Sequence, residues 1–419
     1  MATETKNTKP VYNTEIPSDW EVVEFGEIVN YKKGFAFKNE DYSQQGVRIL
    51  RVSDTNASGI KKEGVVFLES SRAEDFKEWM IKENDIIIQT VGSRPPLYDS
   101  MVGKAILVQK EFSGSLLNQN AVRIRMKIGN NFFLYSHFTT KRYFNFIETL
   151  VRGNANQVSI TLDELFKFKI PLPPFPEQKA IAQVLSTADA AIQTTEKLIT
   201  QKELRKKWLM QQLLTGKKRL KGFENTKWKI QPLENFIKSV VREVPKPDVP
   251  YLGIGLRSHG KGTFLKPDEQ PEKNSMDKFY VVRPNDLIVN ITFAWEQAIA
   301  IVRAEDDGAL ASHRFPTYTF IEDKGHSDFF RFYILLPRMK FMLQMISPGG
   351  AGRNRVMSKS DFIKLEFLLP DYKEQTAIAN VLQVADKEIR LLKAKAEKLR
   401  EQKKWLMQVL LTGKVRLKI

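Results

Sequence analysis

EQKAIAQVLSTADAAI, at residues 177–192, returns almost unchanged as EQTAIANVLQVADKEI at residues 374–389. KKWLMQQLLTGKKRLK, at residues 206–221, likewise returns as KKWLMQVLLTGKVRLK at residues 403–418. The offset is 197 residues throughout, without a gap, and 24 of the 45 aligned positions are identical. Similarity of this extent indicates an internal repeat. The repeat consists of a first copy, residues 177–221, and a second copy, residues 374–418.

Each copy has the sequence features of one long helix. Pro176 and Pro370 mark the two starts, and neither copy contains a proline before the Thr-Gly pair near its end. Gly216 and Gly413 are suited to cap those ends, because glycine readily adopts the left-handed backbone that closes many helices. Apolar residues recur at alternating spacings of four and three, which is typical of a coiled-coil seam. The predicted seam residues are Ile181, Leu185, Ile192, Ile199, Leu209, Leu213, Ile378, Leu382, Ile389, Leu392, Leu399, Leu406 and Leu410.

A seam of about five heptads predicts that the two helices pair as a coiled coil. Helices of this length would each span roughly 55–60 Å. Trp208 and Trp405 lie beside the seam, where we expect them to anchor the packing. Two ordinary amphipathic helices in separate cores are the alternative to this pairing.

The segments that precede the helices are also duplicated, but faintly. NDIIIQT (84–90) resembles NDLIVNI (285–291), and two further pairs of segments correspond, 114–124 with 308–318 and 152–160 with 349–357. The strand-like character of these segments predicts an α+β protein in which two mixed α/β domains alternate with the two helices. The expected boundaries are a polar N-terminal tail at 1–17, a first domain at 18–172, a central helix segment at 173–221, a second domain at 222–369 and a C-terminal helix segment at 370–419.

The charge of the chain suggests a polyanionic partner. Its 66 Lys and Arg residues exceed its 49 Asp and Glu residues by 17, and the two copies hold 12 of these excess positive charges. The absence of cysteine excludes disulfides and thiol-based metal sites. No apolar run is long enough for a membrane helix, and the N-terminus lacks an apolar signal core. We therefore expect a cytoplasmic protein that is not bound to a membrane.

No catalytic constellation is evident in the sequence. The four histidines are scattered without metal-ligand spacing, and no phosphate-binding glycine loop is present. Leu172-Pro173-Pro174-Phe175 resembles the (Asn/Asp)-Pro-Pro-(Tyr/Phe) motif of amino-methyltransferases, but Leu172 replaces the polar residue that would bind the target amine. We interpret this segment as a strand-to-helix turn. The chain is therefore expected to have no catalytic residue and no metal site of its own.

The two copies resemble the specificity subunit of type I restriction–modification systems. The resemblance rests on LPPFPEQKAIAQVLSTAD at residues 172–189, on the LLTGK segments that end both copies, and on their duplication. It covers essentially the whole chain, in the order target-recognition domain, spacer helix, target-recognition domain, spacer helix.

The resemblance implies a division of labour between subunits. Each recognition domain would read one half of a bipartite, asymmetric site in double-stranded DNA, while two antiparallel helices, related by a pseudo-two-fold axis, would set the spacer. Two DNA adenine methyltransferase subunits would dock on the chain, and restriction subunits would add ATP-driven translocation and cleavage. S-adenosylmethionine, ATP and Mg²⁺ would then be held by the partner subunits and none of them by this chain.

Loop residues with hydrogen-bonding side chains are the candidates for contact with DNA, because Arg, Asn and Gln can bind base edges through two hydrogen bonds. For any single one of them, a solvated loop is an equally good interpretation, and the matching pairs Asn154/Gln157 and Arg353/Arg355 could instead hold backbone turns. The candidates are Lys32, Lys33, Arg51, Ser53, Gln89, Arg94, Asn118, Gln119, Asn154 and Gln157 in the first domain, and Arg257, His259, Lys261, Asn290, His313, Arg314, Arg353 and Arg355 in the second.

Two further questions stay open at the level of sequence. The basic residues of the copies could face spacer phosphates, an acidic methyltransferase surface or solvent; they include Lys206, Lys207, Lys217, Lys218, Arg219, Lys221, Lys403, Lys404, Lys414, Arg416 and Lys418. The chain could also be a two-module DNA-binding or architectural protein outside restriction, or a coiled-coil scaffold that binds no nucleic acid. An enzyme is the least favoured class, because the motifs for catalysis are missing.

Overall fold

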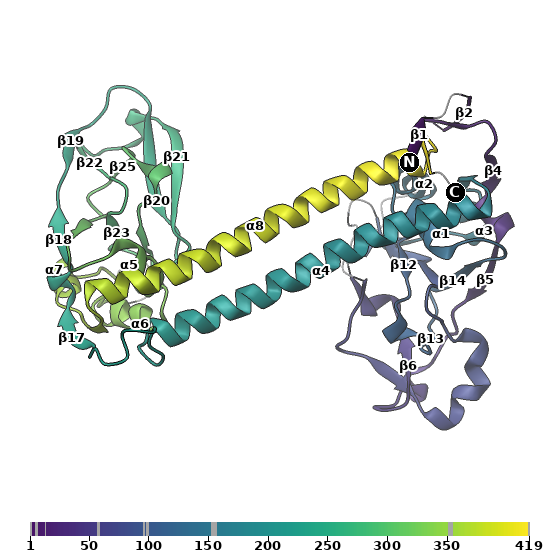
Figure 1. Ribbon diagram of the computed structural model, residues 1–419, viewed down its shortest axis with the longest axis horizontal. Helices are drawn as coiled ribbons and strands as arrows, with labels where there is room; N and C mark the ends of the chain where they lie inside the picture. The colour runs from purple at the N-terminus through teal and green to yellow at the C-terminus, as the bar shows by residue number, and fades with distance from the viewer. Residues whose placement is uncertain are drawn as a thin grey trace. The chain divides into compact units, whose positions relative to one another are not determined.

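The structure is a computed structural model, and it describes residues 2–4, 7–12, 14–56, 59–94, 97, 100–151, 157–350 and 355–417 (Figure 1). The chain forms two compact units. Unit 1 comprises Met1–Glu196 with Lys395–Ile419, and unit 2 comprises Lys197–Ala394. The longest elements are the helices α4 (Phe175–Leu213) and α8 (Tyr372–Leu410), and each unit contains one part of both. The mixed content of helices and strands agrees with the α+β class.

Unit 1 is built on a four-stranded antiparallel sheet of order β12-β10-β14-β5, against which helices α1 and α2 pack. A smaller sheet of order β13-β6-β9 has its own apolar core. The bounds are β5 Val29–Lys33, β6 Val47–Leu50, β9 Val66–Leu68, β10 Ile86–Gln89, β12 Ala105–Leu107, β13 Leu116–Leu117, β14 Ala121–Met126, α1 Asn131–Phe138, α2 Lys141–Leu150 and α3 Leu162–Leu165.

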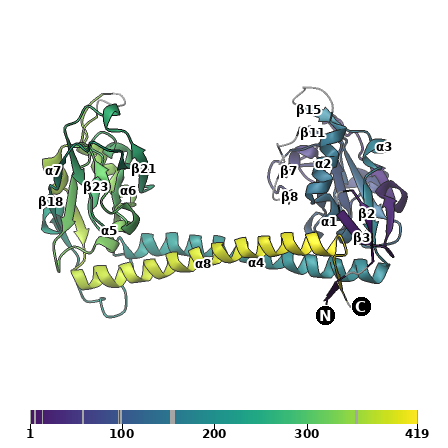
Figure 2. The same cartoon turned by 90° about the horizontal axis from the view of Figure 1, so that it is seen from above.

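Five two-stranded pairings complete unit 1. They are β1 (Ala2–Glu4) with β28 (Val415–Leu417), β2 (Thr8–Val11) with β3 (Thr14–Pro17), β4 (Glu21–Glu24) with β16 (Lys169–Leu172), β7 (Thr55–Asn56) with β8 (Gly59–Ile60), and β11 (Val91–Ser93) with β15 (Gln157–Ser159). The N- and C-terminal segments are therefore hydrogen-bonded to each other, and Figure 2 shows the two ends of the chain close together.

The N-terminal segment is more than the polar tail that the sequence suggested. Its β2–β3 hairpin buries Val11 and Ile16 in the main core of unit 1. Two isolated apolar residues among polar neighbours give no periodic signal, so the composition of residues 1–17 conceals this packing.

Unit 2 contains a four-stranded sheet of order β18-β26-β23-β24, a five-stranded sheet of order β19-β22-β25-β20-β21 and the pair β17–β27. Helices α5 to α7 lie between β26 and β27 in the chain. The bounds are β17 Lys229–Pro232, β18 Ile237–Val240, β19 Glu243–Pro245, β20 Tyr251–Leu256, β21 Thr263–Glu269, β22 Lys278–Val281, β23 Leu287–Val289, β24 Ile299–Ile301, β25 Leu310–Ala311, β26 Thr317–Phe320, β27 Glu366–Leu369, α5 Ser327–Tyr333, α6 Pro337–Met345 and α7 Lys359–Ile363.

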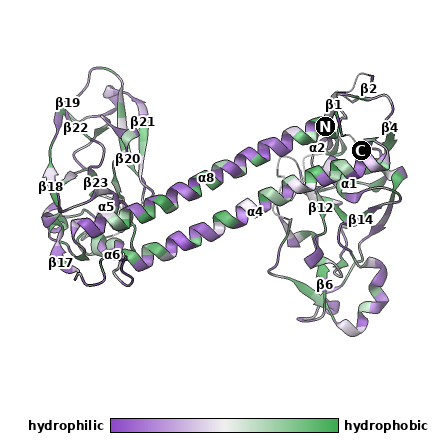
Figure 3. Cartoon of the chain, in the orientation of Figure 1, coloured by the Kyte–Doolittle hydropathy of each residue, from purple (hydrophilic) through white to green (hydrophobic). Residues whose placement is uncertain are grey.

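Each unit buries the start of one long helix and the end of the other. Ile181 and Leu185 of α4 share the core of unit 1 with Leu410 of α8. Ile378 and Leu382 of α8 share the core of unit 2 with Leu213, the last residue of α4. This explains why the sequence is most strongly repeated at the helix ends. Hydrophobic and hydrophilic bands alternate along both helices (Figure 3).

The remaining seam residues are less deeply buried. Ile192 and Ile389 are buried, whereas the other five are only half-buried: Ile199, Leu209, Leu392, Leu399 and Leu406. Trp208 and Trp405 are 46% and 54% exposed, so the expectation that they anchor the packing is wrong. Both side chains fall on the polar side of the stripe that the units bury.

Ion pairs join α4 to α8 within each unit. Unit 1 has Asp189–Lys403 and Glu196–Arg400, each at 2.5 Å between nitrogen and oxygen. In unit 1 the residue further along α4 pairs with the residue earlier in α8, and Glu203–Lys393 and Lys206–Asp386 follow the same order in unit 2, so the helix segments run antiparallel. The pairs of unit 2 are Lys206–Asp386 at 2.5 Å, Lys202–Glu388 at 2.5 Å and Glu203–Lys393 at 2.6 Å.

A Trp–Glu–Arg cluster joins the two copies of the repeat within unit 1. Glu177, at the start of the first copy, is 1% exposed and accepts hydrogen bonds from Arg416, at the end of the second copy, at 2.6 Å. The indole N–H of Trp20 donates to the same carboxylate at 3.3 Å. A buried carboxylate needs such donors, because an unpaired charge away from water is very unfavourable.

Unit 2 contains the corresponding cluster. Glu374 is also 1% exposed and accepts a hydrogen bond from Arg219 Nε at 2.7 Å and one from the indole of Trp228 at 2.9 Å. Gly216 and Gly413, which have left-handed backbones with φ of 70° and 66°, lie against Trp228 and Trp20. The expected role of these glycines at the helix ends agrees with this geometry.

Candidate nucleic-acid interface

An open groove of about 690 Å³ in unit 1 gathers polar side chains from distant parts of the sequence. Six predicted DNA-contact residues line it: Arg51, Ser53, Gln89, Asn118, Gln119 and Gln157. Thr55, Lys61 and Ser100 also line the groove, although the sequence gave no reason to select them. They are isolated polar residues, so only the folded chain places them beside the candidates.

The loop at residues 118–120 is fixed by backbone hydrogen bonds on three sides. The N–H of Asn118 donates to the carbonyl of Leu50, that of Gln119 to Phe35, and that of Thr90 to Asn120, at 2.8–2.9 Å. Gly34 permits this approach, since a Cβ there would lie 1.9 Å from the Asn118 carbonyl oxygen. The loop is therefore held rigidly before any ligand binds.

Several lining side chains are already engaged. Arg51 donates to Asp54 at 2.7 Å and to the carbonyl of Gly64 at 2.7 Å, and the hydrogen bonds to Asp54 raise the pKa of its guanidinium. Lys61 Nζ donates to the carbonyl of Ser53 at 2.8 Å. Asn118 Oδ1 accepts from the N–H of Gln119 at 2.8 Å. These groups shape the groove more than they offer free hydrogen bonds to a ligand.

Within the residues that the structure describes, three other side chains of the groove are exposed and free, and a fourth is buried with one unpaired oxygen. Gln119, Asn120 and Gln157 are exposed, and their amides make no hydrogen bond within the described part of the chain. Gln89 is 1% exposed and donates through Nε2 to Thr55, while its Oε1 has no partner among the described residues. A buried acceptor without a partner is uncommon in folded proteins.

The other first-domain candidates do not line the groove. Lys32 and Lys33 lie on β5; Lys32 pairs with Glu78, its Nζ 4.6 Å from the Trp79 ring centroid, and Lys33 is exposed. Arg94 follows β11. Asn154 lies outside the described residues.

In unit 2, the segment at residues 290–297 brings the candidate loops together. The N–H of Ile291 donates to the carbonyl of Arg314 at 3.0 Å, and that of Met357 donates to the carbonyl of Ile291 at 2.8 Å. The N–H of His259 donates to the carbonyl of Glu296 at 2.7 Å. Three segments that carry candidates therefore adjoin one loop, which itself carries Asn290.

The candidates of unit 2 differ in how freely they could contact a ligand. His259, Lys261, His313 and Arg314 are exposed. The remaining side chains are partly engaged: Arg257 donates to the carbonyl of Thr263 at 2.8 Å, Asn290 Oδ1 accepts from the N–H of Thr292 at 3.0 Å, and Arg355 donates to the carbonyl of Gly350 at 3.0 Å. The bond of Arg355 agrees with its alternative role in a backbone turn. Arg353 lies outside the described residues.

The faint similarity between the domains coincides with matching hydrogen bonds. In unit 1, the N–H of Thr90 donates to the carbonyl of Asn120, and in unit 2 the N–H of Ile291 donates to that of Arg314. A second pair also matches: the N–H of Ile160 donates to the carbonyl of Thr90, and the N–H of Met357 donates to that of Ile291. The aligned segments predict these correspondences residue by residue. Equivalent loops therefore carry different side chains.

The basic residues of the repeat divide into two groups. Lys206 and Lys403 form ion pairs between the helices, and Arg219 and Arg416 bind the buried glutamates. The exposed group consists of Lys207, Lys217, Lys218, Lys221, Lys404 and Lys414. Lys418 lies outside the described residues. Only the exposed group is accessible to phosphates or to a partner protein.

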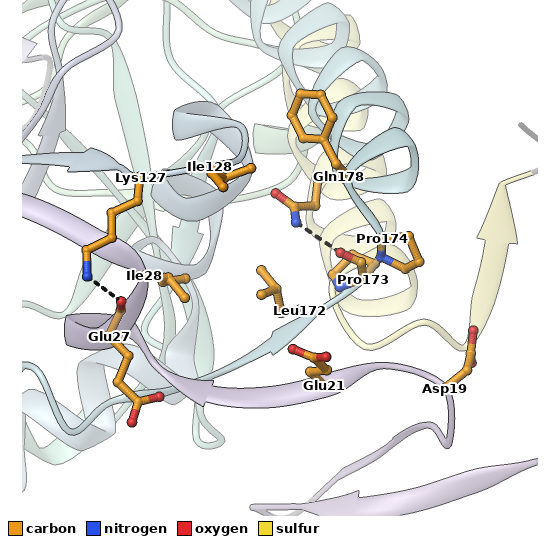
Figure 4. A pocket seen from close by; sticks show the side chains of 11 residues that line it. Asp19, Glu21, Glu27, Ile28, Lys127, Ile128, Leu172, Pro173, Pro174 and Gln178 are labelled. Carbon is orange, nitrogen blue, oxygen red and sulfur yellow. Dashed lines mark hydrogen bonds between the residues drawn. The ribbon is translucent and has the colours of Figure 1, made fainter.

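A second pocket, of about 470 Å³, lies where β16 leads into α4 (Figure 4). Leu172 ends the strand and Phe175 begins the helix, so the Leu-Pro-Pro-Phe segment is a strand-to-helix turn, as the sequence indicated. Gln178 Nε2 donates to the carbonyl of Pro173 at 2.9 Å and holds the turn. Gln375 makes the equivalent bond to Pro370 at 3.0 Å.

The family of the type I restriction modification DNA specificity domain matches this chain twice, over residues 17–203 and 234–401. The chain belongs to this family. Among the specificity subunits similar to it are two from Methanocaldococcus jannaschii. The putative MjaX subunit is 27% identical and the MjaVIII subunit 31%, each over 99% of this chain and 97% of its relative. The EcoAI specificity subunit of Escherichia coli is 29% identical over 44% of this chain and 30% of its own length.

Solved specificity subunits share the fold. The S subunit of M. genitalium covers 99% of this chain and 100% of its own, with a TM-score of 0.57 and 15% identity. The HsdS subunit of Thermoanaerobacter tengcongensis covers 96% and 99%, with a TM-score of 0.50 and 15% identity.

Among the described residues, no three His, Asp or Glu side chains are grouped so that they could hold a metal ion. Likewise, no helix in the described ranges is long and apolar enough to span a membrane.

Proposed function

We propose that each unit of this specificity subunit reads one half of a bipartite, asymmetric site in double-stranded DNA. The proposal rests on two equivalent loops, residues 118–120 and 312–314. Matching backbone hydrogen bonds fix these loops, but they expose different side chains. A rigid loop with free hydrogen-bonding groups is suited to reading base edges in the major groove. Two such loops with different residues favour two different half-sites.

The helices would set the spacer between the half-sites. In this proposal α4 and α8 pair as an antiparallel coiled coil that relates the units by a pseudo-two-fold axis. The ion pairs support it, because Asp189–Lys403 and Lys206–Asp386 are exchanged by the 197-residue offset, and so are Glu196–Arg400 and Glu203–Lys393. A charge-matched seam of this kind specifies orientation and register.

Partner subunits would supply the chemistry. We expect two DNA methyltransferase subunits and restriction subunits to assemble with this chain in the cytoplasm, and to hold S-adenosylmethionine, ATP and Mg²⁺. Trp208 and Trp405 support docking on the helices, since they are exposed and equivalent in the repeat. Exposed aromatic residues of this size are enriched at protein interfaces.

A domain exchange tests the two-reader proposal. Residues 25–168 would be replaced with those of another specificity subunit, so that the β4–β16 pair and the cluster of Trp20, Glu177 and Arg416 are retained. Methylation sites would be mapped in cells that also express the methyltransferase subunit. We expect one half-site to change, while the other half-site and the spacer length stay the same.

The control for this exchange is the chain without partners. Purified alone, it should transfer no methyl group from S-adenosylmethionine to DNA. If the exchange alters both half-sites together, the proposal of two independent readers is wrong. If the chain never co-purifies with a methyltransferase, an architectural DNA-binding role is favoured instead.

A further inference from the structure

We propose that the matching loops before β14 and β26 determine which base each unit reads. In this proposal Gln119 binds adenine in the first half-site, and Arg314, with His313 beside it, binds guanine in the second. The inference rests on the proposed function and adds a chemical identity for each half-site. It predicts the direction in which exchanging these side chains changes the recognised sequence.

The two loops correspond residue by residue, and Gln119 and Arg314 occupy adjacent positions of that correspondence. Asn120 and Arg314 accept the matching hydrogen bonds from Thr90 and Ile291, so Gln119 corresponds to His313. Each loop leads directly into a central strand of its four-stranded sheet. Because strands anchor both loops, a change of side chain should alter the contact to DNA without altering the loop's position.

Gln119 is the best-placed free group of the unit 1 groove. Its side chain is exposed and makes no hydrogen bond within the described ranges. The two cationic groups of the groove, Arg51 and Lys61, are bound to acceptors of the protein itself. Asn120 has a left-handed backbone with φ of 67°, which asparagine tolerates, so the backbone conformation already explains an asparagine at this position. No such conformation explains the glutamine at position 119.

The chemistry of the free groups differs between the units. A side-chain amide can donate from its NH2 group to N7 of adenine and accept through its oxygen from the N6 amino group, whereas a guanidinium donates twice and matches the O6 and N7 acceptors of guanine. The Oε1 of Gln89 also has no partner among the described residues, but it is buried, so Gln119 is the exposed group that could contact a base. In unit 2, the equivalent Asn290 has its Oδ1 bound to Thr292. Among the exposed candidates of unit 2, Arg314 and His313 are the two that the loop before β26 carries.

The variant Gln119→Arg tests the first assignment. The complete complex with methyltransferase subunits would be assayed on duplexes in which each base pair of the first half-site is replaced in turn by the other three. We expect one position to change its preference from adenine to guanine, with a shift of about tenfold in relative methylation rate. Gln45→Arg is the matched control, because Gln45 is an exposed amide of unit 1 outside the groove.

The variant Gln119→Ala keeps this test decisive if arginine prevents assembly. Alanine should reduce discrimination at the same position by about tenfold and leave the second half-site unaffected. Unchanged base preference in both variants would overturn the assignment. If the wild-type complex itself methylates no bipartite site, the proposed function fails, which is a different result.

The reciprocal variant Arg314→Gln tests the second loop. We expect guanine to be replaced by adenine as the preferred base at one position of the second half-site, with the first half-site unchanged. Arg338→Gln, an exposed arginine on α6, is the matched control. A uniform loss of methylation on all duplexes would show instead that Arg314 contacts a phosphate, and would overturn its role in base reading.

Discussion

His137 is a buried imidazole that the fold keeps neutral. The side chain lies on α1 with 0% exposure, its ring stacked edge-on against Phe133 and its Nδ1 3.0 Å from a guanidinium nitrogen of Arg142. Burial, and to a smaller extent the charge of Arg142, lowers the pKa of His137 well below its usual value. Protonation of this ring therefore opposes folding.

The stability of unit 1 should depend on pH through His137. Its contribution is fully present above the unfolded pKa of about 6.5 and is lost as the pH falls below that value, because the unfolded chain then binds the extra proton. The loss approaches about 1.4 kcal/mol per pH unit. Denaturant titrations at pH 7 and pH 5.5 should show it in the wild type but not in His137→Gln.

The exposed His313 provides the control for this measurement. His313→Gln should leave the wild-type loss of stability between pH 7 and pH 5.5 unchanged, because His313 is exposed in the fold. Equal losses in the wild type and in His137→Gln would show that another group is responsible.

Residue type alone does not show which candidate side chains are free to contact DNA and which are bound within the protein. Arg51 and Gln119 are both polar loop residues in the sequence, yet the fold binds Arg51 to Asp54 and leaves Gln119 free. The difference depends on partners close to Arg51 and on the loop geometry around Gln119, neither of which has a periodic signature. Trp208 and Trp405 show the same limit, because aromatic residues beside a seam can face either way.

Helices α4 and α8 were predictable because their signals are local and long. The heptad spacing, the absence of proline after the first turn and the closing glycines all lie within the 39 residues of each helix or next to its end. Strands β1 and β28 were not predictable, since each has three residues and the two are separated by almost the whole chain. Pairing over that distance leaves no pattern in either segment.

Charge reversal should test whether the helix segments of unit 1 depend on their ion pairs. Lys403→Glu places a carboxylate beside Asp189, and both side chains are about three-quarters buried. We expect the free energy of unfolding of unit 1 to fall by about 1 kcal/mol. The double variant Asp189→Lys/Lys403→Glu should recover most of it, as measured by a double-mutant cycle in urea.

Lys404→Glu is the control for charge alone, because Lys404 is exposed and makes no ion pair within the described residues. It should change stability by less than Lys403→Glu does. If the two reversals cost the same, the pair with Asp189 contributes nothing specific.

The groove of unit 1 shows why the site was harder to predict than the framework. Its lining comes from Arg51 in one turn, Gln89 at the end of β10, Ser100, the loop with Gln119, and Gln157 on β15. These segments span about a quarter of the chain, and tertiary packing alone brings them together. The sequence could therefore nominate individual residues but could not indicate which of them share a surface.

The spacer proposal depends on the length of both helices. Four residues would be inserted after Thr200 in α4 and four after Ala394 in α8. The ion pairs of unit 1 then stay on one side of the insertions and those of unit 2 on the other, so all five can persist. Each insertion adds about 6 Å and returns the apolar stripe to within about 40° of its phase.

Because one step of B-DNA is about 3.4 Å, the preferred spacer of the variant should grow by one or two base pairs while both half-sites stay unchanged. The measurement is the methylation rate of the reconstituted complex on duplexes that differ only in spacer length. Four residues inserted after Asp248, in an exposed loop of unit 2, should leave the optimum unaffected. The helix variant could instead assemble and keep the wild-type spacer length. In that case the partner subunits set the distance between the half-sites, because lengthening the helices did not change it.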